Sequence, residues 1–235
     1  MTLCVLTGAS RGVGRATALG LAERGTRLCL LGRRSAALDE TLRLLDEARR
    51  SLGERGAAAV ETIECELSAP DAVERAASEV LERCGAPDVV IHNAGIVERQ
   101  SLEALEDEVW RRQLNVNLEA PMRLTRAFLP SMRSRGSGRV LFVSSISAYL
   151  GSAQQAPYNV SKAGLLALMR CLAEELSDSG LMTCALVPGA IDTDMLRGSP
   201  YPPRMTAEEV ARTLCFLALD AGRAHNGGVV EMLGV

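Results

Sequence analysis

Short apolar runs alternate with longer amphipathic stretches along most of the chain. Several of these runs are apolar at every position, which is expected of strands buried on both faces of a parallel sheet. We therefore predict seven strands, at Leu3–Thr7, Arg27–Leu31, Ala57–Ile63, Asp88–His92, Arg139–Ser144, Met182–Val187 and Gly228–Leu233.

The stretches between these runs have the apolar spacing of helices that cover a sheet. We predict helices at Val13–Arg24, Ser35–Leu52, Ala69–Arg83, Leu102–Leu114, Glu119–Arg133, Pro157–Ser179 and Thr206–Leu219. This alternation predicts an α/β fold: a single doubly wound Rossmann-type domain over residues 1–235, with a parallel seven-stranded sheet and helices on both faces. One long loop of unusual make-up, at about residues 189–205, is expected to be functional as a substrate loop.

Composition limits the classes of function. The 235 residues carry a net charge of −3, which does not indicate a nucleic-acid surface, and their 47% hydrophobic content supports a large core. No apolar stretch reaches the roughly 18 residues of a membrane span, and the N-terminus lacks the layout of a signal peptide. The seven cysteines form no CxxC pair and are interpreted as mostly small buried residues in a reducing compartment. We expect a cytoplasmic protein with no nucleic-acid, membrane or metal partner.

Positive charge is supplied by arginine at every position but one. Of the 26 Lys and Arg residues, only Lys162 is a lysine, and it follows Tyr158 by four positions. Residues with this spacing share one face of a helix. A phenol beside an ammonium has its pKa lowered from about 10 and suits proton transfer. The alternative is a solvated surface lysine near a half-buried tyrosine.

Glycines follow the first predicted strand, in the segment Thr7–Gly14. Such a loop allows a tight turn and lets a pyrophosphate approach backbone N–H groups at the start of the next helix. The spacing is GxxxGxG rather than GxGxxG. The contacts expected with the cofactor in this segment come from Gly8, Ser10, Arg11, Gly12, Val13 and Gly14.

The second strand ends without an acid, at Gly32 followed by Arg33 and Arg34. In dinucleotide sites an acid near this point binds the ribose 2′-hydroxyl, whereas arginine accommodates a 2′-phosphate. The alternative is two exposed arginines at a helix start, where the helix dipole disfavours cations. We therefore predict NADP(H), with Arg33 as the first 2′-phosphate contact and Arg11 as the second.

The fourth strand ends in small residues, at Asn93, Ala94 and Gly95. They leave room for a flat ligand, and the amide of Asn93 can bridge neighbouring strands. His92 precedes them and is interpreted as a packed residue rather than a base or metal ligand, because no metal partners accompany it.

With these pieces in order, the whole chain resembles the short-chain dehydrogenase/reductase family in its single-domain form. The resemblance rests on Thr7–Gly14, Asn93-Ala94-Gly95, Asn117, Ser145, Tyr158 with Lys162, and Pro188-Gly189 with Thr193.

The resemblance implies a role for each catalytic candidate. Ser145 would hold the substrate oxygen, with Ser144 as the less favoured neighbour, and Tyr158 would exchange the proton. Lys162 would lower the pKa of Tyr158 and bind the nicotinamide ribose. Asn117, with Asn115 as its competitor, would hold a water that links the lysine to solvent.

The resemblance also extends the cofactor site. Pro188, Gly189, Ile191 and Thr193 would lie against the nicotinamide carboxamide, while Glu66 and Leu67 would lie on the adenine side. There are two departures: Glu66 stands where many relatives have an aspartate, and the last strand lacks the usual Asp-Gly-Gly ending.

These features predict an NADP(H)-dependent carbonyl reductase or alcohol dehydrogenase. The expected pocket walls are apolar or amide side chains, and no arginine is placed among them to hold a carboxylate. A small, neutral or partly apolar substrate is therefore favoured. The wall residues are Ile96, Val97, Tyr149, Leu150, Gln154, Gln155 and Met195. The alternative is a cofactor-binding regulator or sensor of the same fold with little turnover. Because the helix from Pro157 is apolar nearly all round, we also predict a homodimer built on it and the preceding helix, with a homotetramer left open.

Overall fold

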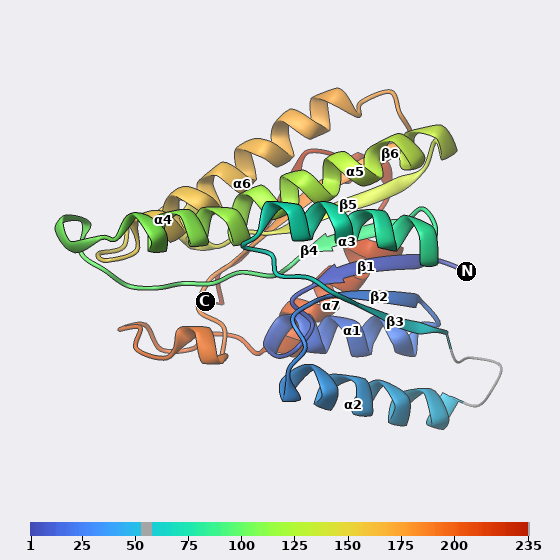
Figure 1. Cartoon of the computed structure of the whole chain (residues 1–235), viewed down its shortest axis with the longest axis horizontal. Coiled ribbons are helices and arrows are strands. Elements are labelled where there is room, and N and C mark those ends of the chain that lie inside the picture. Colours follow the sequence, from blue (N-terminus) through green and yellow to red (C-terminus); the bar gives the residue numbers. More distant parts are fainter. Residues whose placement is uncertain (53–57, 235) are drawn as a thin grey trace.

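A parallel seven-stranded sheet forms the centre of the molecule (Figure 1). The structure is a computed structural model that describes residues 1–52 and 58–234. In that part of the chain the strand order is β3-β2-β1-β4-β5-β6-β7. The strands are β1 (Leu3–Thr7), β2 (Arg27–Gly32), β3 (Val60–Glu64), β4 (Val89–His92), β5 (Gly138–Val143), β6 (Leu181–Pro188) and β7 (Gly228–Met232). The predicted fold class is confirmed.

Helices cover both faces of the sheet (Figure 1). On one face lie α3 (Pro70–Arg83), α4 (Asp107–Leu114), α5 (Ala120–Arg135) and α6 (Ala156–Glu175). On the other face lie α1 (Gly12–Glu23), α2 (Ala36–Leu52) and α7 (Ala207–Leu219).

Side chains of each strand alternate between the two cores. In β1, Leu3 and Val5 belong to the core under α3, α5 and α6, while Cys4 and Leu6 belong to the core under α1, α2 and α7. The first four positions of this strand therefore face apolar surroundings, which explains why they are all apolar rather than alternating.

Strand boundaries differ slightly from the prediction. The third strand begins at Val60, and Ala57, where we expected it to begin, lies outside the described residues. Six of the seven cysteines are buried, as expected of small apolar residues, whereas Cys171 is exposed on α6.

The predicted helix Leu102–Leu114 is wrong in its first half. Residues Leu102–Ala104 form a single 3₁₀ turn, and α4 begins only at Asp107. Asp107 and Glu108 then occupy its first turn, where the helix dipole favours acids. The following residues, Asn115–Glu119, form a π-helical turn that runs into α5. Such turns occur mostly as single bulges and often at functional sites.

Candidate active site

The carboxyl ends of β1 and β4 are neighbours at the point where the chain reverses its direction across the sheet. In open parallel sheets this reversal leaves a crevice outside the strand ends, where ligands bind. The glycine segment follows β1 and the Asn93–Gly95 segment follows β4, so the topology brings the two predicted cofactor segments to the same edge.

Close packing fixes the glycine segment. A Cβ atom on Gly14 would lie 2.1 Å from the carbonyl oxygen of Gly8, and one on Gly8 would lie 2.8 Å from the Cα of Ala94. The side-chain amide of Asn93 donates to the carbonyls of Thr7 and Gly8, each at 3.1 Å. Asn93 therefore bridges the ends of β1 and β4, as expected.

The N-terminus of α1 is open to an anion. The side chain of the N-cap residue, Arg11, forms no capping hydrogen bond with the helix, and the first turn contains no acid. Its N–H groups and the positive end of the helix dipole therefore suit a pyrophosphate. Ser10 lies in the turn before the helix and Val13 is buried in its first turn. Thr193 lies across the entrance, where its Cγ2 would be 3.2 Å from a Cβ on Gly12.

The three arginines predicted to bind the cofactor near the 2′-phosphate are exposed. A Cβ on Gly32 would meet nothing within 4 Å, so the end of β2 is open. Arg33 is 3.7 Å from Glu66 and Arg34 is 3.6 Å from Glu64, in both cases near the outer limit of an ion pair. Arg11 pairs with Asp194 at 3.3 Å.

The sequence analysis missed a fourth arginine, which is structural. Arg15 donates to the carbonyls of Ser10 at 2.7 Å and Ala37 at 3.0 Å, and to the hydroxyl of Thr41 at 3.0 Å. It thus holds the glycine segment against α2. The position of Arg15 could have indicated this role, because the helix dipole disfavours a cation in the first turn of a helix unless the cation has carbonyl partners.

Glu66 lies beside the Arg33 end of the site. Partial burial opposes its ionisation, but the backbone and hydroxyl of Ser68 donate to it and Arg33 lies near, so its pKa falls below the usual range. Leu67 is buried beside it. Asn115 donates to the carbonyl of Ser68 at 2.9 Å, which places this competitor of Asn117 on the Glu66 side of the cleft.

Lys162 is buried and held by the backbone. Its side chain reaches the end of β5, where Nζ donates to the carbonyl oxygen of Val143 at 2.9 Å. Burial lowers the pKa of Lys162 to about 8. Ser144 donates to the carbonyl of Lys162 at 2.9 Å, so its hydroxyl supports the helix backbone and is engaged away from a substrate.

Asn117 lies on the π-helical turn and is fully buried. Its amide accepts from the N–H of Ile96 at 2.8 Å and donates to the carbonyl of Ile96 at 2.9 Å and to Ser161 at 3.0 Å. A Cβ on Gly95 would lie 3.3 Å from Nζ of Lys162 and 3.5 Å from Oδ1 of Asn117. The structure therefore brings Asn117, and not Asn115, beside the lysine.

Tyr158 is buried one helical turn before Lys162, and its hydroxyl lies 4.0 Å from the sulfur of Met195. The pKa of Tyr158 is raised above its usual value because burial outweighs a hydrogen bond with Ser145 and the charge of Arg99. Nζ of Lys162 is 5.7 Å from the ring centroid and turned toward Val143, and the lowering of the Tyr158 pKa by Lys162 stays a prediction.

Ser145 lies just after β5 and is near enough to Tyr158 to oppose the rise in the pKa of that phenol. Its hydroxyl accepts from the N–H of Ser147 at 3.1 Å, which fixes the side chain at the start of a short 3₁₀ turn. This bond leaves the hydroxyl hydrogen free to donate.

His92 is packed as predicted. It is buried, stacks on Phe142 with the ring centroids 5.0 Å apart, and pairs with the hydroxyl of Thr125 at 2.8 Å. Burial lowers the pKa of His92 to about 3. It therefore stays neutral at physiological pH.

The segment after β6 closes the crevice. Pro188 ends that strand, the N–H of Gly189 donates to Met232 at 2.7 Å, and Ile191 pairs with Met205 in an isolated bridge. This segment leads to the 3₁₀ turn Asp194–Leu196, which carries Met195 over Tyr158.

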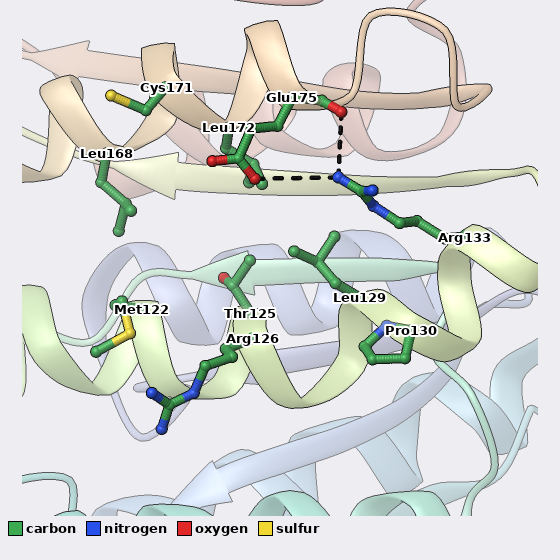
Figure 2. Close-up of a pocket in the computed structure, with 10 residues that line it drawn as sticks. All are labelled: Met122, Thr125, Arg126, Leu129, Pro130, Arg133, Leu168, Cys171, Leu172 and Glu175. Carbon is green, nitrogen blue, oxygen red and sulfur yellow. Dashed lines mark hydrogen bonds and ion pairs between the residues drawn. The ribbon is translucent and has the colours of Figure 1, made fainter.

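A cavity of about 580 Å³ lies away from this crevice, between α5 and α6 (Figure 2). Its lining is largely apolar, with Arg133 bridging to Glu175 at one end. The described residues include no group of three or more His, Cys, Asp or Glu that could hold a metal. In the same part of the chain, no helix is both long and apolar enough to cross a membrane.

Comparison with known proteins agrees with this arrangement. The family model described as short chain dehydrogenase matches residues 2–201. The 3-oxoacyl-acyl-carrier-protein reductase of Pseudomonas aeruginosa is 31% identical over 244 residues, which cover 99% of this chain and 96% of the relative. The cis-4-hydroxycyclohexanecarboxylate dehydrogenase of Sinomonas cyclohexanicum is 33% identical over 245 residues, with 99% and 95% covered.

Solved structures show the same fold. One described as an NAD(P)-dependent gluconate 5-dehydrogenase from Beutenbergia cavernae, with NADP bound at low occupancy, has a TM-score of 0.88 and 30% identity over 99% of this chain and 95% of that one. Levodione reductase has a TM-score of 0.87 and 28% identity, with 98% and 95% covered.

Proposed function

The chain belongs to the short-chain dehydrogenase family, and we propose that it is an NADP(H)-dependent oxidoreductase that interconverts a carbonyl and a secondary alcohol on a small, partly apolar substrate. The observation that carries this proposal is the convergence of Ser145, Tyr158 and Lys162 at the crevice beside the glycine segment. A protein that only binds a nucleotide has no need of a buried phenol and ammonium at this place.

In the reductive direction, Tyr158 donates its proton to the substrate carbonyl oxygen, and Ser145 donates a hydrogen bond to the same oxygen. A bound reduced nicotinamide supplies the hydride that the carbonyl carbon accepts. The raised pKa of Tyr158 keeps the phenol protonated near neutral pH, which is the form that reduction requires. In oxidation, Tyr158 accepts the proton of the alcohol.

Lys162 and Asn117 support this proton transfer. Nζ uses one donor on Val143 and has two more for the ribose hydroxyls of the nicotinamide nucleotide. Asn117 fixes the backbone of Ile96 and lies beside Nζ, where it can order a water that carries protons out of the site.

The preference for NADP(H) is supported by the open end of β2 and the arginines around it. Glu66 and Glu64 partly neutralise Arg33 and Arg34, but exposed ion pairs of this length contribute little. A phosphate dianion that accepts bidentate bonds from Arg33 would compete well with them. The relative with bound NADP agrees with this assignment.

The remaining expected contacts fit one bound dinucleotide. Pyrophosphate contacts come from the glycine segment, adenine-side contacts from Glu66 and Leu67, and nicotinamide-side contacts from the residues that follow β4 and β6. The substrate role of residues 189–205 and the cytoplasmic location remain predictions.

The test is turnover of NADPH with a panel of aldehydes, ketones and quinones. We expect NADPH to be consumed in step with alcohol formation, and more slowly when NADH replaces it. Tight binding of NADPH without turnover of any member would contradict the proposal and favour the regulator or sensor instead.

We also propose that the protein is a homodimer through α5 and α6. The outer face of α6 has a stripe of small or apolar residues at helical spacing, namely Val160, Ala163, Ala167, Leu168 and Cys171. Small side chains let a second helix approach closely. Leu168 and Cys171 of this stripe also line the cavity between α5 and α6 (Figure 2).

Light scattering tests the dimer. The expected mass is twice the 25.1 kDa of the chain, and Leu168→Glu should shift it toward the monomer. Leu102→Glu, at a position 74% exposed outside the stripe, is the control. A fully active wild-type monomer would contradict the proposal, and the tetramer stays open.

A further inference from the structure

Arg99 lies at the mouth of the crevice, on the segment that follows β4. Its Nη1 donates to the carbonyl oxygen of Arg197 at 3.3 Å. Arg197 is two residues beyond Met195, whose sulfur is 4.0 Å from the hydroxyl of Tyr158. The guanidinium and the phenol therefore approach the same short stretch of the substrate loop, and the charge of Arg99 is close enough to lower the pKa of Tyr158.

The acids around Arg99 are engaged by other groups. Its neighbour Glu98 accepts from two nitrogens of Arg112. Asp194 pairs with both Arg11 and Arg197, and Glu106 lies within 3.5 Å of the amide of Gln100. Within residues 1–52 and 58–234, no carboxylate lies at ion-pair distance from Arg99.

Arg99 is also half-buried, unlike most arginines of the surface. A cation that is partly removed from water and has only a carbonyl partner retains several donors in a planar fork. That fork matches the two oxygens of a carboxylate. An anionic group placed there would gain charge-assisted hydrogen bonds that solvent does not fully screen.

We propose that Arg99 binds a carboxylate of the substrate, so that the enzyme acts on oxo acids and the corresponding hydroxy acids. This inference rests on the proposed function and deepens it. It departs from the expectation of a neutral substrate, which depended on finding no arginine placed to hold a carboxylate. The apolar pocket walls still favour a substrate that is partly apolar.

A purely structural role is the competing explanation, because Arg99 joins two loops. A second hydrogen bond already holds this segment nearby, since the N–H of Gln100 donates to the carbonyl of Gln154 at 3.0 Å. Arg99→Gln separates the two roles, because glutamine keeps a donor for the Arg197 carbonyl but lacks the charge. Arg111→Gln is the matched control, since the guanidinium of Arg111 is exposed on α4 and paired with Asp107 at 2.9 Å.

The experiment compares oxo acids with their methyl esters, in a series that moves the carboxylate stepwise away from the carbonyl. For the wild type we expect kcat/KM on the best acid to exceed that on its ester about tenfold or more. Arg99→Gln should lose about tenfold to hundredfold on the acid and little on the ester, while Arg111→Gln should change neither. Equal rates on acid and ester, or an equal loss on both in Arg99→Gln, would overturn the inference.

A binding measurement separates this inference from the proposed function. The oxo acids are titrated by calorimetry into NADPH-loaded Tyr158→Phe protein, with and without Arg99→Gln. Weaker binding of the acid in the double variant supports the carboxylate site even if the wild type shows no turnover, in which case the proposed function alone fails. Unchanged binding of the acid, or no binding to either protein, would overturn the inference.

Discussion

The two sides of the crevice hold their cations in opposite ways. On the substrate side Lys162 is 3% exposed and donates to a backbone carbonyl at 2.9 Å. On the cofactor side the side chains of Arg33 and Arg34 are 76% and 87% exposed, with carboxylates 3.7 and 3.6 Å away.

This difference in burial indicates the role that each cation can take. A buried ammonium is held in one position and its pKa depends on its surroundings, so it suits a role in proton transfer. Exposed guanidiniums keep their charge and can rearrange around a phosphate, so each contributes modestly and one can partly replace another. We therefore expect the buried Lys162 to tolerate no substitution that changes the shape of its side chain. The exposed arginines should tolerate several substitutions.

The largest effect is expected from Lys162→Arg. The larger guanidinium has no room, because a Cβ on neighbouring Gly95 would already lie 3.3 Å from Nζ. We expect kcat to fall about a hundredfold or more, although the charge is kept. Steady-state turnover measures this, with Arg33→Lys as the control that should remain active. An active Lys162→Arg enzyme would remove the distinction between the two sides.

Stability against pH measures how strongly Lys162 is buried. Its pKa is about 8 in the folded protein and 10.5 ordinarily, so below about pH 8 folding carries the full cost of burying the charge. As pH rises toward 10.5 the folded protein loses this proton first, and the cost is relieved by about 3 kcal/mol.

Lys162→Met isolates this term, because other groups titrate alike in both proteins. The free energy of unfolding of the wild type, relative to this variant, should rise between pH 8 and 10.5 in denaturant titrations. A relative stability that does not change with pH would mean that the ammonium is solvated.

Asn117→Ala tests whether the amide of Asn117 holds the backbone beside the buried Lys162. It removes the partners of the N–H and carbonyl of Ile96, so we expect a loss of about 1–3 kcal/mol in the free energy of unfolding. Turnover should fall as well. Asn115→Ala, which removes one bond to Ser68, is the matched control and should leave kcat nearly unchanged. Equal effects on kcat would contradict the assignment of Asn117.

The smallest effect is expected from Arg33→Ala. The Kd for NADPH should rise about tenfold, because one charged contact with the phosphate is lost while Arg34 and Arg11 remain. The Kd for NADH should change little. Fluorescence titration with both cofactors measures this. If NADPH binding is unchanged, Arg33 is not the phosphate contact, and a wild type that prefers NADH would contradict the NADP(H) assignment.

The fold followed from the sequence because apolar runs and glycine turns are local signals. The same signals placed Asn93 between β1 and β4, where its amide bonds were then found. The π-helical turn carried no such signal, because a single wide turn has no pattern of its own. The start of α4 was predicted too early because the prediction included the 3₁₀ turn Leu102–Ala104 in the helix.

Long-range contacts explain the other misses. Arg15 and Arg99 look like surface cations in the sequence, and only the packing of distant loops gives them carbonyl partners. Spacing along a helix also shows neither how deeply the phenol of Tyr158 is buried nor that the ammonium of Lys162 points toward Val143.

The most direct test of the account is a single turnover with Tyr158→Phe, a change that removes only the phenolic hydroxyl. NADPH-loaded protein is mixed with the best carbonyl substrate of the wild type, and NADPH oxidation is followed after its binding has been measured by fluorescence. The account predicts that NADPH binds about as tightly as to the wild type and is not oxidised on the time scale of wild-type turnover. Oxidation at a rate near that of the wild type would contradict the role of Tyr158 as the proton donor.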